Sequence, residues 1–442
     1  MTSGWIRVLP SFLRLRFENS PTLQRIIANA SWLFGDRILR LGVGMLVGVW
    51  IARYLGPAQY GVLSYALAIV ALFMPLVTLG MDSIVVRDLV QDPSRRNEIS
   101  GTVFALRLIF ALGISPVIFS ILLLTWPDDA LMRTAVMIAT CGLLFQSFEV
   151  IDLWFQSQIE SRYAVIAKNA AFVSVTAIRV LLLLFQAPVL AFVMATVVEA
   201  ALGGLAMAVV YQRTGQRFTA WRFSRSTASA LLRECWPFLI SSLAIMVYMR
   251  IDQVMLGGLG DVEEVGIYSA AVRLSEVWYF IPTGIVSSAF PAIVLSKKES
   301  ETVYLKRLQE LMTAMVAMAY AIAIPMTLLS TPLVKLLFGD AYAASGPVLA
   351  VHIWSGVGVF AGVTRGSWVV TEGLGKFLLV MTIVGAIVNI ALNYALIPSW
   401  GALGAAIATL VAYLFTAFAM PWLFSRTRPI ARVMLRSLVL LR

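Results

Sequence analysis

Apolar residues occur along this chain in long, continuous runs that are separated by short polar links. A helix needs about 20 mostly apolar residues to cross the hydrocarbon core of a bilayer, and these runs reach or exceed that length. The links contain turn-forming residues, for example in Leu55-Gly56-Pro57 and Pro398-Ser399-Trp400-Gly401. We therefore predict an all-α polytopic membrane protein with about twelve transmembrane helices, neighbouring ones antiparallel. The predicted spans are residues 28–54, 58–80, 99–125, 131–151, 163–186, 188–211, 235–257, 264–290, 309–330, 347–370, 376–397 and 401–424.

The composition favours the same fold class. Hydrophobic residues make up 60% of the 442 residues and charged residues 13%, whereas soluble domains have about 45–50% and about 25%. These values exclude a secreted enzyme, a disordered chain and a disulfide scaffold. Continuous apolar runs also exclude a transmembrane β-barrel, whose strands are short and alternate apolar with polar residues. The N-terminus lacks a compact apolar core followed by a cleavage site, so we expect no cleavable signal peptide.

The positions of Lys and Arg predict the orientation. If the N-terminus is cytoplasmic, the inner segments contain 23 basic residues and the outer links contain only Arg133 and Lys335. By the positive-inside rule, both termini are expected in the cytoplasm. The basic segment 425–442 has apolar residues among its arginines, so we expect a surface helix on anionic lipid. Nucleic-acid binding is not expected.

A short internal repeat relates the first six spans to the last six. Segment 55–66 (LGPAQYGVLSYA) and segment 259–270 (LGDVEEVGIYSA) share Leu-Gly, a later Gly, and a Ser close to an Ala. Six spans separate the copies, so both have one orientation, and two six-helix bundles related by a pseudo-twofold axis along the membrane normal are expected around a central cavity. The predicted divisions are a cytoplasmic lead-in (1–27), an N-terminal six-helix bundle (28–211), a basic cytoplasmic linker (212–234), a C-terminal six-helix bundle (235–424) and a basic amphipathic tail (425–442).

Nine basic residues lie within the predicted spans, where a charge facing lipid costs at least about 2.5–3.5 kcal/mol. Lys168, Arg365 and Arg53 are close enough to span ends to extend their charges to the interface. The deeper arginines need acidic partners or water. Asp36 and Arg40 (i, i+4) can pair on one helix face, as can Arg273 and Glu276 (i, i+3), whereas Arg250 and Asp252 need partners elsewhere.

The arginines at depth outnumber the acids, which leaves two interpretations. Pairing alone is one. The other is a water-filled cavity for an anionic substrate, because Arg binds phosphate oxygens with two parallel hydrogen bonds and stays charged. The candidate binding residues are Arg37, Arg40, Arg107, Arg179, Arg250 and Arg273. No catalytic constellation, metal-ligand cluster or phosphate loop is evident, so we expect a transporter that uses no cofactor, and not an enzyme.

Several segments resemble a known family. Segments 29–36 (NASWLFGD) and 51–61 (IARYLGPAQYG) are similar to the opening of the Wzx-type polysaccharide and O-antigen repeat-unit flippases. Further similarity lies in segments 80–82 (GMD), 250–256 (RIDQVML) and 336–339 (LLFG). This family is the polysaccharide branch of the multidrug/oligosaccharidyl-lipid/polysaccharide (MOP) exporter superfamily.

The resemblance implies two six-helix bundles in a V shape and transport by alternating access. It implies an undecaprenyl-pyrophosphate-linked oligosaccharide as substrate, flipped to the outer leaflet of the bacterial inner membrane for surface or exopolysaccharide synthesis. A polysaccharide polymerase and other assembly proteins are possible partners. Coupling to a proton or sodium gradient is expected by analogy, with Asp36, Asp252 and Glu276 as candidates. A cation-coupled exporter of amphipathic drugs, in the same superfamily, is the alternative.

Overall fold

The computed structural model describes residues 21–439, with side chains from residue 32 onward except at positions 33, 34 and 291. Part of the predicted lead-in and the last three residues therefore lie outside the described residues. Within that range the chain is helical and has no strand. The helices are α2 (Pro21–Thr78), α3 (Asp82–Gln91), α4 (Arg96–Thr125), α5 (Ala130–Cys141), α6 (Glu149–Ser157), α7 (Arg162–Leu184), α8 (Val189–Arg213), α9 (Arg225–Leu259), α10 (Val262–Glu276), α11 (Phe280–Glu299), α12 (Glu301–Leu328), α13 (Ser330–Phe338), α14 (Ser345–His352), α15 (Ser355–Thr371), α16 (Gly375–Leu414) and α17 (Arg428–Leu438).

Ten helical stretches in the described part of the chain are long and apolar enough to cross a membrane. This confirms a multi-pass membrane protein. The two longest stretches each contain a non-helical glycine, Gly56 (φ 70°) in α2 and Gly401 (φ 51°) in α16. Glycine is favoured there because positive φ is costly for residues with a Cβ. Both breaks coincide with links that the sequence predicts between two spans, and the count of twelve helices stays a prediction.

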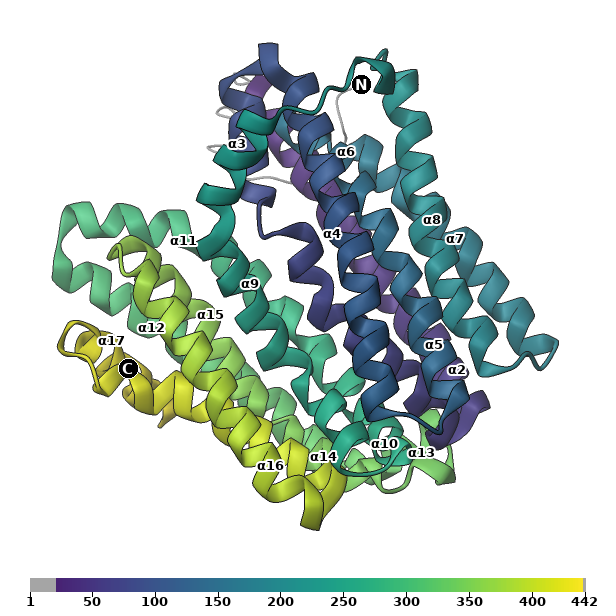
Figure 1. The fold of residues 1–442 in the computed structure, drawn as a ribbon. Helices are drawn as coiled ribbons and strands as arrows, with labels where there is room; N and C mark the ends of the chain where they lie inside the picture. The colour runs from purple at the N-terminus through teal and green to yellow at the C-terminus, as the bar shows by residue number, and fades with distance from the viewer. Residues whose placement is uncertain (1–20, 440–442) are drawn as a thin grey trace.

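The helices form two groups that converge at one end and spread apart at the other (Figure 1). The first group consists of α2 to α8 and the second of α10 to α17, and α9 runs between them. Helices α10, α13 and α14 lie where the two groups meet. Helix α9 packs against α2 and α4 of the first group and against α16 of the second. It therefore connects the two groups along its length.

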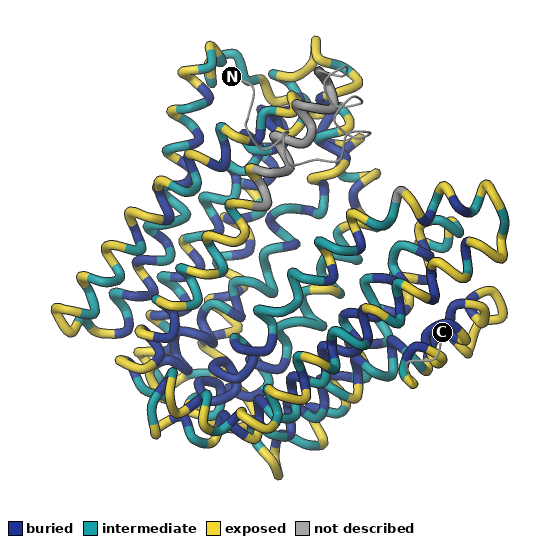
Figure 2. The backbone as a smooth tube through the Cα atoms, turned by 180° about the vertical axis from the view of Figure 1, so that it is seen from behind, coloured by how far each residue is buried: buried dark blue, intermediate teal, exposed yellow. Residues whose placement is uncertain are grey.

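The buried apolar residues explain this V shape. One core cluster contains residues of both groups, including Ala66 and Val136 of the first and Val265 and Leu349 of the second. A second cluster lies within the first group and the beginning of α9, and a third lies within the second group alone. The shared cluster holds the converging ends together, while each arm has a core of its own. Buried backbone is prominent where the groups meet (Figure 2).

Many large apolar side chains on the outer surface are exposed, including Leu124, Leu184, Phe185 and Leu328. A soluble protein would bury residues of this size, because each removes a large apolar area from water. In a bilayer they face lipid chains at no such cost. The exposed apolar surface therefore agrees with membrane insertion.

The basic tail differs from its prediction in one respect. The apolar face of α17, with Ile430 and Met434 fully buried, packs against the protein and mainly against α12. Gln309 Nε2 of α12 donates a hydrogen bond to Ser437 Oγ (2.8 Å), and Tyr320 OH donates to the Leu438 carbonyl (3.1 Å). The helix therefore does not place its apolar face in lipid. Its exposed side presents Arg428, Arg432 and Arg436.

Candidate functional site

A pocket of about 190 Å³ lies where the two groups meet. Most of its lining comes from α2, α7 and α8 of the first group, and Arg273 of α10 enters from the second. Its polar lining residues are Tyr60, Thr176, Arg179, Thr196 and Arg273. Two of the six predicted binding arginines thus share one pocket, and they reach it from opposite sides of the V.

Arg273 is held by backbone and hydroxyl oxygens. Its Nη2 donates to the Gly44 carbonyl (2.6 Å) and its Nη1 donates to Tyr60 OH (3.3 Å). The guanidinium lies so close to α2 that a Cβ on Gly48 would be 1.9 Å from Nη2. Among the described residues, no carboxylate lies within 4.0 Å of this guanidinium. The positive charge of Arg273 is therefore available to an anion in the pocket.

The predicted pair of Arg273 with Glu276 is not formed. Glu276 Oε2 instead accepts from Arg250 Nη2 at 3.2 Å. An i, i+3 spacing places two side chains near each other, but Arg273 extends toward α2 while Glu276 lies against α9. Glu276 is therefore the partner that the sequence leaves open for Arg250, and Arg273 is a deep arginine with no carboxylate partner in the described part of the chain.

A second pocket, of about 270 Å³, lies within the first group and shares Thr196 with the pocket just described. Its charged lining residues are Arg40, Glu149, Lys168 and Glu199. The predicted pair of Arg40 with Asp36 is present, with Arg40 Nε 2.7 Å from Asp36 Oδ1. The two pockets are adjacent through Thr196, and both have lining residues from α2, α7 and α8; together they are called the charged track.

Glu199 links two of the predicted arginines. Its Oε2 is 2.9 Å from Arg179 Nη1, and its Oε1 is 3.7 Å from Arg40 Nη1. Arg179 Nη2 also donates to Thr196 Oγ1 at 3.3 Å. The sequence analysis missed Glu199, although an acid inside the predicted span 188–211 is itself a signal. It also did not single out Tyr60, Thr176 and Thr196, whose hydroxyl groups are common in membrane helices.

Two cations predicted to reach the interface are bound inside the protein instead. Lys168 Nζ lies 2.5 Å from Glu149 Oε2 and 2.8 Å from Asp152 Oδ2. Arg365 is buried, and its Nη1 donates to the Thr416 carbonyl (2.5 Å). Thr416 lies in a π-helix, Phe415–Ala419, which frees carbonyl oxygens from the regular α-helical pattern. Arg53 is exposed, as a charge that extends to the interface requires, and its Nη1 donates across the junction to the Leu336 carbonyl (3.4 Å).

The two remaining predicted arginines lie apart from these pockets. Arg107 is fully buried and binds Asp82 and the Gln146 carbonyl, all within the first group. Arg37 is exposed on α2. Arg179 thus shares one pocket with Arg273 and the carboxylate of Glu199 with Arg40, whereas Arg37, Arg107 and Arg250 line neither pocket.

Asp252 of α9 is the centre of a buried polar cluster that α9 forms with α10 and α16. Its Oδ2 accepts from Tyr268 OH (2.7 Å) and Thr409 Oγ1 (2.6 Å), and its Oδ1 accepts from Asn393 Nδ2 (2.5 Å). Asn393 Nδ2 also donates to Asn389 Oδ1 (3.1 Å). Asn389 Nδ2 and Asn393 Oδ1 are buried without a hydrogen-bond partner. Carboxylate, amide and hydroxyl oxygens are ligands that hard cations prefer.

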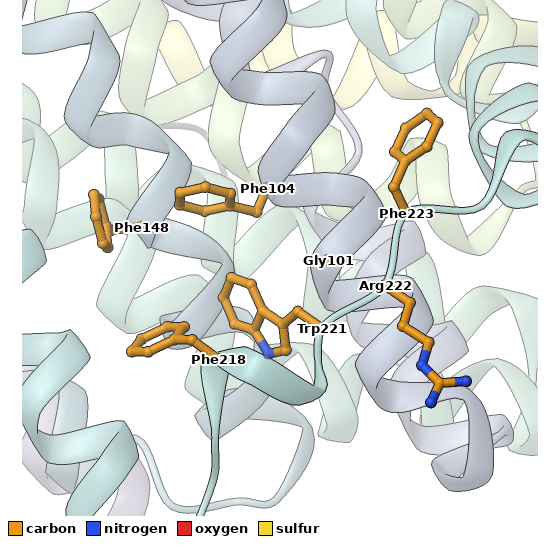
Figure 3. Close-up of a pocket in the computed structure, with 7 residues that line it drawn as sticks. All are labelled: Gly101, Phe104, Phe148, Phe218, Trp221, Arg222 and Phe223. Atoms are coloured by element: carbon orange, nitrogen blue, oxygen red, sulfur yellow. The ribbon is translucent and has the colours of Figure 1, made fainter.

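A third pocket, of about 370 Å³, lies at the spread end of the first group (Figure 3). The linker chain crosses α4 there, with Phe104 and Phe148 of the bundle close to Phe218 and Trp221 of the linker. Arg222 N donates to the Asn97 carbonyl (3.2 Å), and Ser224 N donates to Thr102 Oγ1 (3.1 Å). The linker is therefore bound to the first group.

The models of two known protein families match this chain. The model of the polysaccharide biosynthesis protein family matches residues 26–296. The chain belongs to that family. A model of the MatE family matches residues 237–395. The resemblance found in the sequence is thereby confirmed, and the matched ranges together include most of both helix groups.

A curated relative is the probable flippase AglR of Haloferax volcanii, which is 32% identical over 203 residues. This match covers 42% of the chain described here and 40% of AglR. It therefore spans less than half of either protein.

Two solved structures show the same fold. An inward-facing multidrug-resistance MATE-family transporter of the MOP superfamily superimposes with a TM-score of 0.72 at 16% identity, covering 89% of this chain and 95% of that chain. The lipid II flippase MurJ in an inward-closed conformation gives a TM-score of 0.71 at 14% identity, covering 93% and 91%. The two-bundle fold of MOP transporters is thus confirmed for this protein.

Proposed function

We propose that this protein is a flippase for an undecaprenyl-pyrophosphate-linked oligosaccharide repeat unit. It moves the unit from the cytoplasmic to the outer leaflet of the bacterial inner membrane, for cell-surface or exopolysaccharide synthesis. Membership of the polysaccharide biosynthesis protein family and the partial match to a probable flippase support this proposal. The lipid tail would stay in the bilayer while the polar head group crosses between the two helix groups.

The observation that carries the proposal is the position of Arg273. It enters the junction pocket from the second group, has no carboxylate partner among the described residues, and faces a lining that contains Arg179 of the first group. A pyrophosphate carries several negative charges and many acceptor oxygens, so it can bind arginines from both sides at once. A substrate bound in this way would connect the two groups as they move.

The proposed mechanism is alternating access. The structure is closed at the end that contains the shared core and spread at the opposite end (Figure 1). The linker and α17, both rich in arginine, lie toward the spread ends of the arms. With both termini in the cytoplasm, the spread end faces the cytoplasm, which suits loading of a substrate made there. Arg428, Arg432 and Arg436 of α17 would then face anionic head groups of that leaflet.

We propose Asp252 as the group that couples transport to a cation gradient. It is a buried carboxylate surrounded by Tyr268, Thr409 and Asn393 in a helix group that must move. Binding of a proton or sodium ion there would neutralise the charge and alter the packing of α9 against α16. Glu276 and Asp36 are less suited to this role, because each already neutralises an arginine.

The alternative is a cation-coupled exporter of amphipathic compounds, which the MatE family match and the MATE-family structure favour. A cationic drug needs an acidic site, whereas Arg273 gives the junction pocket an unpaired positive charge. The test is transport by the purified protein in liposomes. We expect flipping of a fluorescent prenyl-pyrophosphate-linked saccharide, its loss in Arg273→Ala, and no uptake of ethidium. Uptake of ethidium without flipping of the saccharide would overturn the proposal in favour of the alternative.

A further inference from the structure

Glu199 occupies an unusual position for a transporter of anions, because it places a carboxylate between two arginines of the charged track. It projects from α8 toward Arg179 of α7 and Arg40 of α2. If Glu199 were absent, these two guanidinium groups would lie inside the membrane with fewer counter-charges whenever no substrate is bound, and this is costly. Glu199 supplies a negative charge to both.

The hydrogen bonding of the two guanidinium groups is incomplete. Glu199 forms a close ion pair with Arg179 (2.9 Å), but its contact with Arg40 is 3.7 Å and too long for a hydrogen bond. Asp36 binds Arg40 Nε (2.7 Å), yet Arg40 Nη2 is buried and has no hydrogen-bond partner. The hydrogen bond from Arg179 Nη2 to Thr196 Oγ1 is long, at 3.3 Å. The cluster therefore contains donors that Glu199 and Asp36 do not satisfy.

A phosphate group would satisfy them better. The pyrophosphate of a lipid-linked saccharide has two phosphoryl groups, each with two non-bridging acceptor oxygens and one negative charge, whereas a carboxylate has two oxygens in a plane and a single charge. Thr196 lines both pockets, so a phosphate beside it could contact Arg179 and approach Arg40 along the charged track. Arg273 lines the pocket on the other side.

We propose that Glu199 is a resident counter-ion that the phosphate of the substrate displaces from Arg179 and Arg40. It is a specificity-determining residue, because a ligand must outcompete a carboxylate to bind, and only a strongly charged, multi-oxygen anion does so. It also promotes release, since Glu199 returns to the arginines as the phosphate leaves. The inference rests on the proposed function, and it assigns a role to a residue that acts on the binding arginines.

The proposal reverses the expectation for an ordinary salt bridge. If Glu199 only stabilises the binding site, Glu199→Gln weakens anion binding because the arginines lose their positions. If Glu199 competes with the substrate, Glu199→Gln strengthens anion binding, because the competing carboxylate charge is removed. We expect roughly tenfold tighter binding of inorganic pyrophosphate, measured by calorimetry on the purified protein in detergent, together with slower turnover in liposomes because release is impaired.

Two further variants make the result decisive. Glu199→Asp keeps the negative charge, but its side chain is one methylene shorter and reaches the arginines less well. If contact between the carboxylate and the arginines is what competes with the phosphate, Glu199→Asp should also bind pyrophosphate more tightly than the wild type. Asp152→Asn removes one negative charge from a residue that lines neither pocket, where Lys168 keeps Glu149 as a partner, and it should leave pyrophosphate affinity close to wild type. Equal strengthening by Asp152→Asn and Glu199→Gln would indicate a general charge effect and overturn the proposal.

The failure of this inference is distinguishable from failure of the proposed function. Wild-type protein that binds pyrophosphate, with Glu199→Gln binding it equally or less well in a folded state, would exclude displacement and leave the flippase proposal intact. Wild-type protein that binds ethidium and no pyrophosphate would exclude both. Thermal melting of each variant establishes whether it is folded before affinities are compared.

Discussion

The carbonyl oxygen of Val262 occupies the place where Gly61 would otherwise carry a side chain. A Cβ on Gly61 would lie 1.9 Å from this oxygen. A second contact of the same kind joins Gly266 and the Pro57 carbonyl, where a Cβ would lie 2.0 Å away. Val262 follows Pro57 by 205 residues, and Gly266 follows Gly61 by the same number. The two copies of the sequence repeat therefore cross each other through reciprocal contacts at the closed end of the V.

The first prediction concerns this crossing. Gly61→Ala or Gly266→Ala should destabilise the protein by about 1–3 kcal/mol, because the added methyl group overlaps a backbone oxygen and forces the helices apart. Thermal melting of the purified protein measures the loss. Gly203→Ala in α8 is a matched control, since nothing lies within 4 Å of its added Cβ. Equal melting temperatures for Gly61→Ala and Gly203→Ala would contradict a tight crossing.

The second prediction separates a binding arginine from a paired one. Arg273→Ala should abolish transport with a small effect on stability, because no carboxylate is left uncompensated by the change. Arg250→Ala should lower stability by about 1–3 kcal/mol, because Glu276 loses its partner. The double variant Arg250→Met, Glu276→Met should recover most of that stability.

Melting and transport measured on the same preparations test this difference. If Arg250→Ala were as stable as wild type, the ion pair with Glu276 would contribute nothing. If Arg273→Ala transported normally, the junction pocket would not be the anion site.

The third prediction addresses coupling. Asp252→Asn should make any transport independent of the cation gradient or abolish it, while pyrophosphate binding persists at the junction pocket, which Asp252 does not line. Flipping assays under imposed sodium and proton gradients measure the dependence. Asp340→Asn is a suitable control, because Asp340 is exposed beyond α13 and pairs only with Lys335 among the described residues. A gradient dependence that survives in Asp252→Asn would assign coupling elsewhere.

The fourth prediction concerns α17. Met434→Asp should destabilise the protein by at least about 2 kcal/mol, because Met434 is fully buried in the core of the second group. Leu435→Asp, at the adjacent and half-exposed position, should change stability little. Similar losses from the two substitutions would mean that α17 does not dock on α12 through its apolar face.

The sequence by itself determined the membrane class, the approximate positions of the spans, the relation between the two halves and the family. These properties follow from local hydrophobicity and short turn motifs, which each segment carries independently of its neighbours. The Asp36 and Arg40 pair was also predictable, because both residues lie on one helix and the helix fixes their spacing.

The partners of the other charges were decided only by the tertiary structure. Arg250 pairs with Glu276, Arg179 with Glu199 and Lys168 with Glu149, and each pair joins different helices. The same holds for Asp252, whose neighbours Thr409 and Asn393 come from much later in the chain. Hydrophobicity determines that a helix enters the membrane but not how it is rotated about its axis. Packing at the junction sets that rotation, and with it which arginine is left free for an anion.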